Sequence, residues 1–262
     1  MVQQLQPLAI NPERLYPDSD GKPLADNTIQ LRLIFTIKGG LDALFKERED
    51  VFVAADLLWY PVRLSQDEVR AEKKPQTQAP DVMVVFGRPK NDRGSYRQWQ
   101  EDNIAPQMAF EILSPSNSLE EMQKKFAFYQ THGIEEYYVY DPEKNRLQGW
   151  LRQGGTLAEI AQMEGWQSPL LGIRFSTREG DLALFHPNGE RFVDFVEVVE
   201  QRDRQQQRAI QAEDQRDRAI ETAARERQEK EQTQAALEEA NKKNQQLLER
   251  LRQLGVDPET LL

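Results

Sequence analysis

The sequence predicts an α/β fold in which helices flank a mixed β-sheet and a long helix follows at the C-terminus. Short apolar runs bounded by polar turns are typical of buried strands, and three of them occupy 82–86, 108–113 and 137–140. Apolar residues at helical spacing fill segments before and between these runs. From Phe195 the composition changes to Gln, Arg, Glu and Ala, with no glycine or proline until Gly255.

The N-terminal region predicts an arm and then a helix. Residues 1–25 are polar and rich in proline, which favours an extended conformation. Asp26 or Asn27 can cap a helix that runs to about Phe45.

A strand and a long polar loop are expected next. Residues 51–62 are rich in β-branched and aromatic side chains and predict a strand that contains Asp56. Residues 87–104 predict a surface loop, whose side chains either contact nucleic acid or are simply solvated. Its larger side chains include Arg88, Lys90, Arg93, Arg97 and Trp99.

A helix and a hairpin complete the predicted sheet. Ser118 and Glu121 have the spacing of a capping box, and Gly133 is suited to a left-handed C-cap. Strands are expected at 136–141 and 146–152, joined by a turn. The order strand, strand, helix, strand, strand after an N-terminal helix indicates a mixed sheet with helices packed on it.

These patterns divide the chain into an arm at 1–25, a domain at 26–193 and a helical segment at 194–262. A heptad frame taken back from Leu254 predicts a coiled coil in the leucine-rich half of the last segment, because it places mostly apolar residues on one seam. The seam residues are Leu237, Ala240, Asn244, Leu247, Leu251 and Leu254. Upstream, the same frame places Thr233, Lys230 and Glu226 on the seam, so that part is expected to be a charged helix. A buried Asn244 would select a parallel dimer, so we expect a homodimer.

The amino-acid composition limits which catalytic groups and metal ligands the chain can use. The chain has no cysteine and only two histidines, which excludes thiol chemistry and leaves carboxylates as the ligands for a hard cation such as Mg²⁺. A net charge of −10 argues against a surface that coats nucleic acid non-specifically. No signal peptide or membrane span is evident, so the expected location is the cytoplasm, with no membrane partner.

Two acids stand out at the apolar runs. Asp81 leads the first run and Glu111 lies in the second, so adjacent strands would bring them to facing positions. Two carboxylates can hold a divalent cation that activates water against a phosphodiester, and a lysine nearby can stabilise the developing charge. Acids at strand ends are also common without any catalytic role.

Several motifs, in order and with their spacing, resemble one family. They are Pro80-Asp81, FEILSPS at 110–116, KFAFY at 125–129 and GIEEYYVYDP at 133–142. The set resembles the Uma-type family of restriction-endonuclease-like proteins, which is similar to the wider PD-(D/E)xK nuclease superfamily. The resemblance covers roughly residues 24–190.

The resemblance implies a restriction-endonuclease-like fold and metal-dependent cleavage of DNA. It implies Asp81 and Glu111 as ligands of Mg²⁺ or Mn²⁺ and Lys125 as the catalytic lysine. The superfamily pattern has a lysine two residues after the second acid, where this chain has Leu113, and in the Uma-type family the lysine is displaced onto the next helix. Lys124 competes for that assignment. The alternative is an inactive nuclease fold that serves as an assembly module through its coiled coil.

Other polar and aromatic residues have structural interpretations. Ser114 and Ser116 are expected to satisfy loop amides, and His132 to lie at the surface or compensate the helix dipole. The aromatic residues are assigned mostly to the core: Phe126, Phe128, Tyr129 and Tyr137 to Tyr140.

Overall fold

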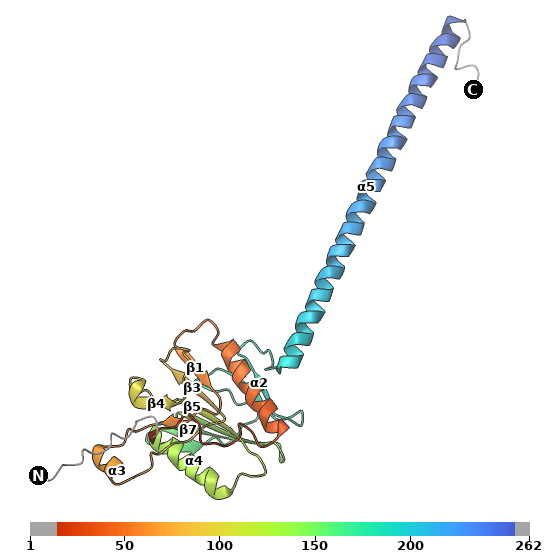
Figure 1. Ribbon diagram of the computed structural model, residues 1–262. Coiled ribbons are helices and arrows are strands. Elements are labelled where there is room, and N and C mark those ends of the chain that lie inside the picture. Colours follow the sequence, from red (N-terminus) through yellow and green to blue (C-terminus); the bar gives the residue numbers. More distant parts are fainter. Residues whose placement is uncertain (1–14, 255–262) are drawn as a thin grey trace, which may run out of the picture. The chain divides into compact units, whose positions relative to one another are not determined.

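The computed structural model describes residues 15–254 (Figure 1). The chain separates into two compact units, with the boundary between Glu197 and Val198. Residues 1–14, within the predicted arm, and residues 255–262, at the end of the predicted helical segment, lie outside the described residues.

The first unit is built on a six-stranded mixed sheet, as the sequence predicts. Its strand order is β1-β3-β5-β6-β7-β8. The strands are β1 (Val51–Ala54), β3 (Val82–Phe86), β5 (Met108–Ile112), β6 (Glu136–Asp141), β7 (Arg146–Gln153) and β8 (Thr156–Glu159). β5 and β6 are parallel and the other neighbouring pairs are antiparallel. A parallel pair needs a crossover connection, and helix α4 (Leu119–His132) provides it.

Short elements complete the unit. They are α3 (Gln66–Arg70), the 3-10 turn η1 (Gln98–Gln100), β2 (Trp59–Tyr60), β4 (Tyr96–Arg97), β9 (Arg174–Ser176) and β10 (Ala183–Phe185). β2 pairs with β4 in parallel, and β9 pairs with β10 in antiparallel orientation.

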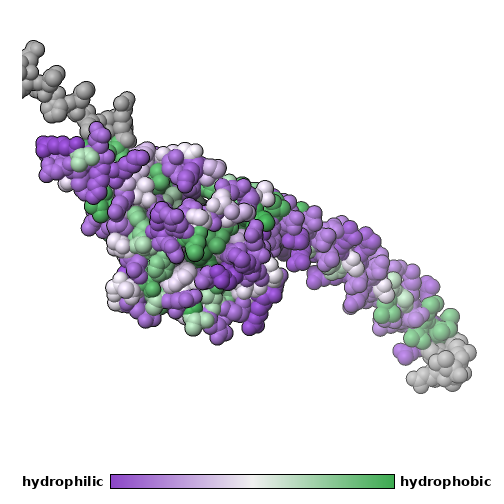
Figure 2. Space-filling view, turned by 90° about the horizontal axis from the view of Figure 1, so that it is seen from below, coloured by the Kyte–Doolittle hydropathy of each residue, from purple (hydrophilic) through white to green (hydrophobic). Residues whose placement is uncertain are grey.

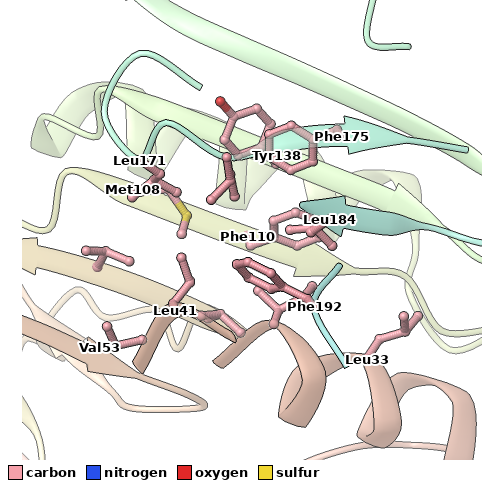
Figure 3. Close-up of a cluster of buried hydrophobic side chains, with 14 of the residues drawn as sticks. Leu33, Leu41, Val53, Met108, Phe110, Tyr138, Leu171, Phe175, Leu184 and Phe192 are labelled. Atoms are coloured by element: carbon pink, nitrogen blue, oxygen red, sulfur yellow. The ribbon is translucent and has the colours of Figure 1, made fainter. Parts of the chain in front are cut away.

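Helix α2 (Thr28–Leu44) covers one face of the sheet (Figure 1). Asn27 caps it by accepting a hydrogen bond from the Gln30 amide, which confirms the predicted start. Its apolar side chains pack on alternate residues of the central strands and on Phe192 (Figure 3). Gly40 permits this contact, because a Cβ atom there would lie 2.0 Å from the Phe192 ring.

Helix α4 packs against the opposite face. Tyr129 of this helix is fully buried against Trp59 and Tyr137, in a second apolar core. Gly133 ends the helix with φ of 97°, the left-handed C-cap that the sequence predicts. Successive side chains of a strand point to opposite faces of the sheet, and the two helices cover opposite faces. Phe110 of β5 therefore faces α2, and the next residue, Glu111, faces α4.

The prediction of a single strand at 51–62 is wrong, because two separate strands, β1 and β2, occupy this segment. β1 ends at Ala54, and the chain turns away from the sheet to form β2, which pairs with β4. Asp56 lies in the turn with φ of 48°, a left-handed conformation that aspartate tolerates better than most residues. Asp56 is therefore a turn residue and not a strand residue.

The expected surface loop at 87–104 is also more ordered than predicted, because it contains β4 and η1. Arg88 and Arg93 both pair with Glu101, at 2.8 and 2.7 Å. The guanidinium of Arg93 also lies 4.1 Å from the centroid of the Phe52 ring. These arginines hold the segment together through internal contacts, which favours the structural interpretation over a nucleic-acid contact.

The described part of the second unit consists of α5 from Val198 onward; α5 as a whole (Phe195–Gln253) is a continuous helix of 59 residues. Figure 2 shows it as hydrophilic over much of its length, with apolar side chains gathered toward its C-terminal part. Leu237 and Leu247, on the predicted seam, are 61% and 57% exposed. No helix in the described part of the chain is long and apolar enough to cross a membrane.

Candidate active site

The two predicted acids face one another on neighbouring strands. Asp81 directly precedes β3 and Glu111 lies in β5, and the register that sets Val82 opposite Phe110 places them as the next opposing pair. Asp81 is held in place by the amide of Ile112, which donates to Oδ2 over 2.6 Å. The prediction of facing carboxylates is confirmed.

One lysine of α4 reaches this pair. Lys125 Nζ lies 2.6 Å from Glu111 Oε2, and its side chain is only 13% exposed. Lys124 points elsewhere: its side chain is 70% exposed and pairs with Glu120 one turn away. Adjacent helical residues are rotated by about 100°, so only one of the two can face the sheet. The structure selects Lys125.

Tyr129 completes the surroundings of Glu111. Its hydroxyl donates to Oε1, so Lys125 and Tyr129 each bind one oxygen of the carboxylate. Sequence reasoning assigned Tyr129 to the core, which is correct for the ring but missed the hydroxyl. The sequence did contain a signal for this contact. Residues four apart on a helix lie on the same face, so if Lys125 faces Glu111, Tyr129 faces it as well.

Burial raises the pKa values of two carboxyl groups here. The pKa of Asp81 rises to about 7, first because of burial and then because of the negative charge of Glu111. The pKa of Asp56 rises to about 6, mainly through burial and then through the charge of Asp20. Burial disfavours the charged form of Lys125, but Glu111 and Asp81 outweigh it, so the pKa of Lys125 is raised. The site carries negative charge that one ammonium group does not fully compensate.

These groups line a cleft of about 420 Å³. Its acidic residues are Asp20, Asp26, Asp56, Asp81, Glu111 and Glu121, and its basic residues are Lys22 and Lys125. Within residues 15–254, no three side chains of the His, Cys, Asp or Glu type come close enough together to hold a metal ion by themselves. Mg²⁺ is commonly held by one or two carboxylates together with waters and substrate phosphates, so Asp81 and Glu111 fit such an ion.

A second layer of contacts fixes the loop between β5 and α4. The hydroxyls of Ser114 and Ser116 both donate to Asp26 Oδ2. The prediction that these serines bind loop amides is therefore wrong, because the segment before α2 brings the Asp26 carboxylate to them. Gln30 donates to the carbonyl of Ile112 over 3.0 Å and ties α2 to the end of β5.

At the start of α4, only one of the two hydrogen bonds of the predicted capping box forms. Ser118 accepts from the amide of Glu121 over 3.1 Å. The Glu121 carboxylate instead accepts from the Asn117 side chain and lines the cleft. His132, at the other end of the helix, is half-buried and its ring lies 4.6 Å from that of Phe128.

The chain resembles the crystal structure of a putative nuclease belonging to DUF820 from Anabaena variabilis, with 15% sequence identity, a TM-score of 0.43, and coverage of 61% of this chain and 83% of that one. Comparison with curated proteins returns no match. The model of the Uma2 family, described as "Putative restriction endonuclease", matches residues 20–184. The match spans more than half of the chain, which therefore belongs to the Uma2 family.

Proposed function

We propose that the protein is a metal-dependent endonuclease that hydrolyses phosphodiester bonds of DNA, with residues 26–193 as its catalytic domain. The observation that supports this most is the convergence of Asp81, Glu111 and Lys125 on one cleft, in a chain of the Uma2 family. The sequence alone leaves open which lysine takes part. The cleft contains Lys125 and not Lys124.

The proposed roles follow from the contacts. Asp81, directly before β3, and Glu111 of β5 would hold Mg²⁺ or Mn²⁺ through their carboxylate oxygens. When bound, such an ion polarises the scissile phosphate and lowers the pKa of a coordinated water. Lys125 holds the Glu111 carboxylate and supplies positive charge where charge develops on the phosphate. Tyr129 keeps Glu111 oriented through its hydroxyl.

The cleft is strongly acidic, and this supports a metal requirement. Six acidic residues face two lysines, so an approaching phosphate would be repelled in the absence of added positive charge. The positive charge of a divalent cation held by Asp81 and Glu111 would offset this repulsion.

The test is a cleavage assay with matched lysine variants. Plasmid and single-stranded DNA are incubated at low salt with Mg²⁺ or Mn²⁺ and the wild type, Asp81→Ala, Glu111→Ala, Lys125→Ala or Lys124→Ala. We expect cleavage by the wild type and Lys124→Ala, and losses of at least about a hundredfold in the other three. No cleavage by the wild type under any condition, or equal cleavage by all variants, would refute the catalytic role.

A second candidate is an inactive nuclease fold used for assembly. Leu113, in place of the superfamily lysine, and the net charge of −10 favour it. Under this alternative the wild type would bind DNA or a partner without cleaving DNA.

We further propose that α5 pairs with a second copy through its seam. Apolar side chains exposed on an otherwise polar helix are stabilised when another helix covers them. Light scattering on the full chain should give a dimer for the wild type and a monomer for the double variant Leu237→Glu, Leu247→Glu. Gln245→Glu, off the seam, is the control for added charge. A monomeric wild type, or a dimeric double variant, contradicts this pairing.

A further inference from the structure

A second groove lies on the same face of the sheet as the acidic cleft, between α4 and strands β6 and β7. Its volume is about 510 Å³. Glu111, Val139 and Gln148 are successive neighbours across β5, β6 and β7, and Val139 and Gln148 line the groove. Asn117 lines both cavities, so they adjoin at the start of α4.

One part of the groove is aromatic. Trp150 and Tyr137, paired across β6 and β7, stack with ring centroids 5.3 Å apart, and Phe126 of α4 meets Trp150 edge-on at 5.5 Å. Trp150 is partly exposed, so the structure leaves an aromatic surface open to the groove. Aromatic side chains of this kind are the platforms on which nucleic-acid bases stack.

Tyr137 adds a second, unexplained feature. It lines the groove and is 1% exposed. Its hydroxyl is the one buried side-chain polar atom without a hydrogen-bond partner among residues 15–254. Buried polar groups are nearly always paired, so this hydroxyl is an exception among the described residues. It lies near enough to Glu111 and Asp81 of the acidic cleft for their charges to raise the pKa of Tyr137 further, after burial.

The rest of the lining combines four apolar side chains, Leu113, Leu119, Met122 and Val139, with amides and charged groups. Arg146 makes no ion pair with any described carboxylate and donates only to the Gln148 side chain, at 2.9 Å. Lys144 pairs with Asp141 over 2.9 Å but keeps a side chain that is 70% exposed. Two cations against one acid give this groove a net positive lining on a chain of net charge −10. Such a lining is complementary to phosphates.

We propose that this groove binds nucleotides of a single DNA strand next to the scissile bond, with a base against Trp150 and a phosphate at Arg146. This proposal rests on the proposed nuclease function in one respect: that function places the scissile bond in the acidic cleft beside the groove. The groove has the volume of a small-ligand site, which suits a few nucleotides and not a duplex. Its amide side chains, Asn117, Gln123 and Gln148, can bond base edges without demanding one sequence.

The test is binding of a fluorescent oligo(dT) and of a hairpin duplex to the full chain, measured by anisotropy in EDTA. Base stacking contributes about five- to a hundredfold in affinity, so Trp150→Leu should weaken oligo(dT) binding at least about fivefold. Arg146→Ala should weaken it and reduce the slope of log affinity against log salt by about 0.7, the value for one phosphate contact on a single strand. Duplex binding should change less than about twofold in both.

Arg63→Ala is the matched control, because it removes the same charge from an exposed position outside the groove. If Trp150→Leu loses its near-UV circular dichroism, Arg146→Ala decides alone, since its side chain is exposed. The proposal is overturned if the wild type does not bind oligo(dT), or if Arg146→Ala binds it with the affinity and salt slope of Arg63→Ala. It is also overturned if groove variants change only the oligomeric mass, which would mark a protein-protein surface.

The same measurements separate the two proposals. Binding in EDTA does not require catalysis, so Trp150-dependent binding without cleavage by the wild type refutes the nuclease and retains the groove. Cleavage by the wild type with no effect of either groove variant on binding refutes the groove and retains the nuclease.

Discussion

Replacing Asp81 by asparagine should stabilise the protein at high pH. Asp81 is buried beside Glu111, and its pKa is about 7 in the folded state against 3.8 for an unperturbed aspartate. Between these values the folded state holds a proton that the unfolded state has released, so stability falls as pH rises through this interval. Each pKa unit corresponds to about 1.36 kcal/mol, which gives a loss of about 4 kcal/mol by pH 8.

Asparagine has nearly the same shape and carries no charge at any of these pH values. Its side-chain oxygen can still accept from the Ile112 amide, which is the contact that positions Asp81. The stability difference between Asp81→Asn and the wild type should therefore grow from near zero at pH 4 to about 4 kcal/mol in favour of the variant at pH 8. Because the comparison is between variants, groups that titrate equally in both do not contribute.

The assay is urea unfolding in EDTA at pH 4, 6 and 8. Tryptophan fluorescence reports the first unit alone, because all four tryptophans lie before residue 198. Glu120→Gln is the control: this exposed acid pairs with Lys124 one turn away, so its effect should stay within about 0.5 kcal/mol at every pH. A difference between Asp81→Asn and the wild type that does not change with pH, or a variant less stable at pH 8, would refute the electrostatic reasoning.

Three further substitutions test the contacts around the site and the core. Tyr129→Phe removes a donor from the buried Glu111 and should cost about 1–3 kcal/mol in urea unfolding, together with a loss of cleavage rate. Glu136→Gln places an amide among the hydroxyl and amide donors that bind this buried carboxylate and should also cost about 1–3 kcal/mol, checked by thermal unfolding. Arg93→Ala leaves the largely buried Glu101 with a weaker set of partners and should cost about 3 kcal/mol, measured by urea unfolding. A change below about 0.5 kcal/mol in any of these would contradict the contact concerned.

The sequence by itself determined the local features of this protein. Three apolar runs gave the central strands, Asn27 and Gly133 marked a start and an end of helices, and the absence of glycine and proline gave α5. The sequence also predicted that Asp81 and Glu111 lie opposite each other on adjacent strands. These features depend on hydrogen bonds and periodicities within a few residues or between adjacent strands, which a sequence displays directly.

Only the tertiary structure decided which side chains share the site. The packing of α4 on the sheet selected Lys125 over Lys124 and turned the hydroxyl of Tyr129 onto Glu111. It also placed Asp56 in a turn, where a sequence pattern had suggested one strand. Contacts of this kind join residues far apart in the chain, and their geometry depends on how helix and sheet pack, which local propensity does not encode.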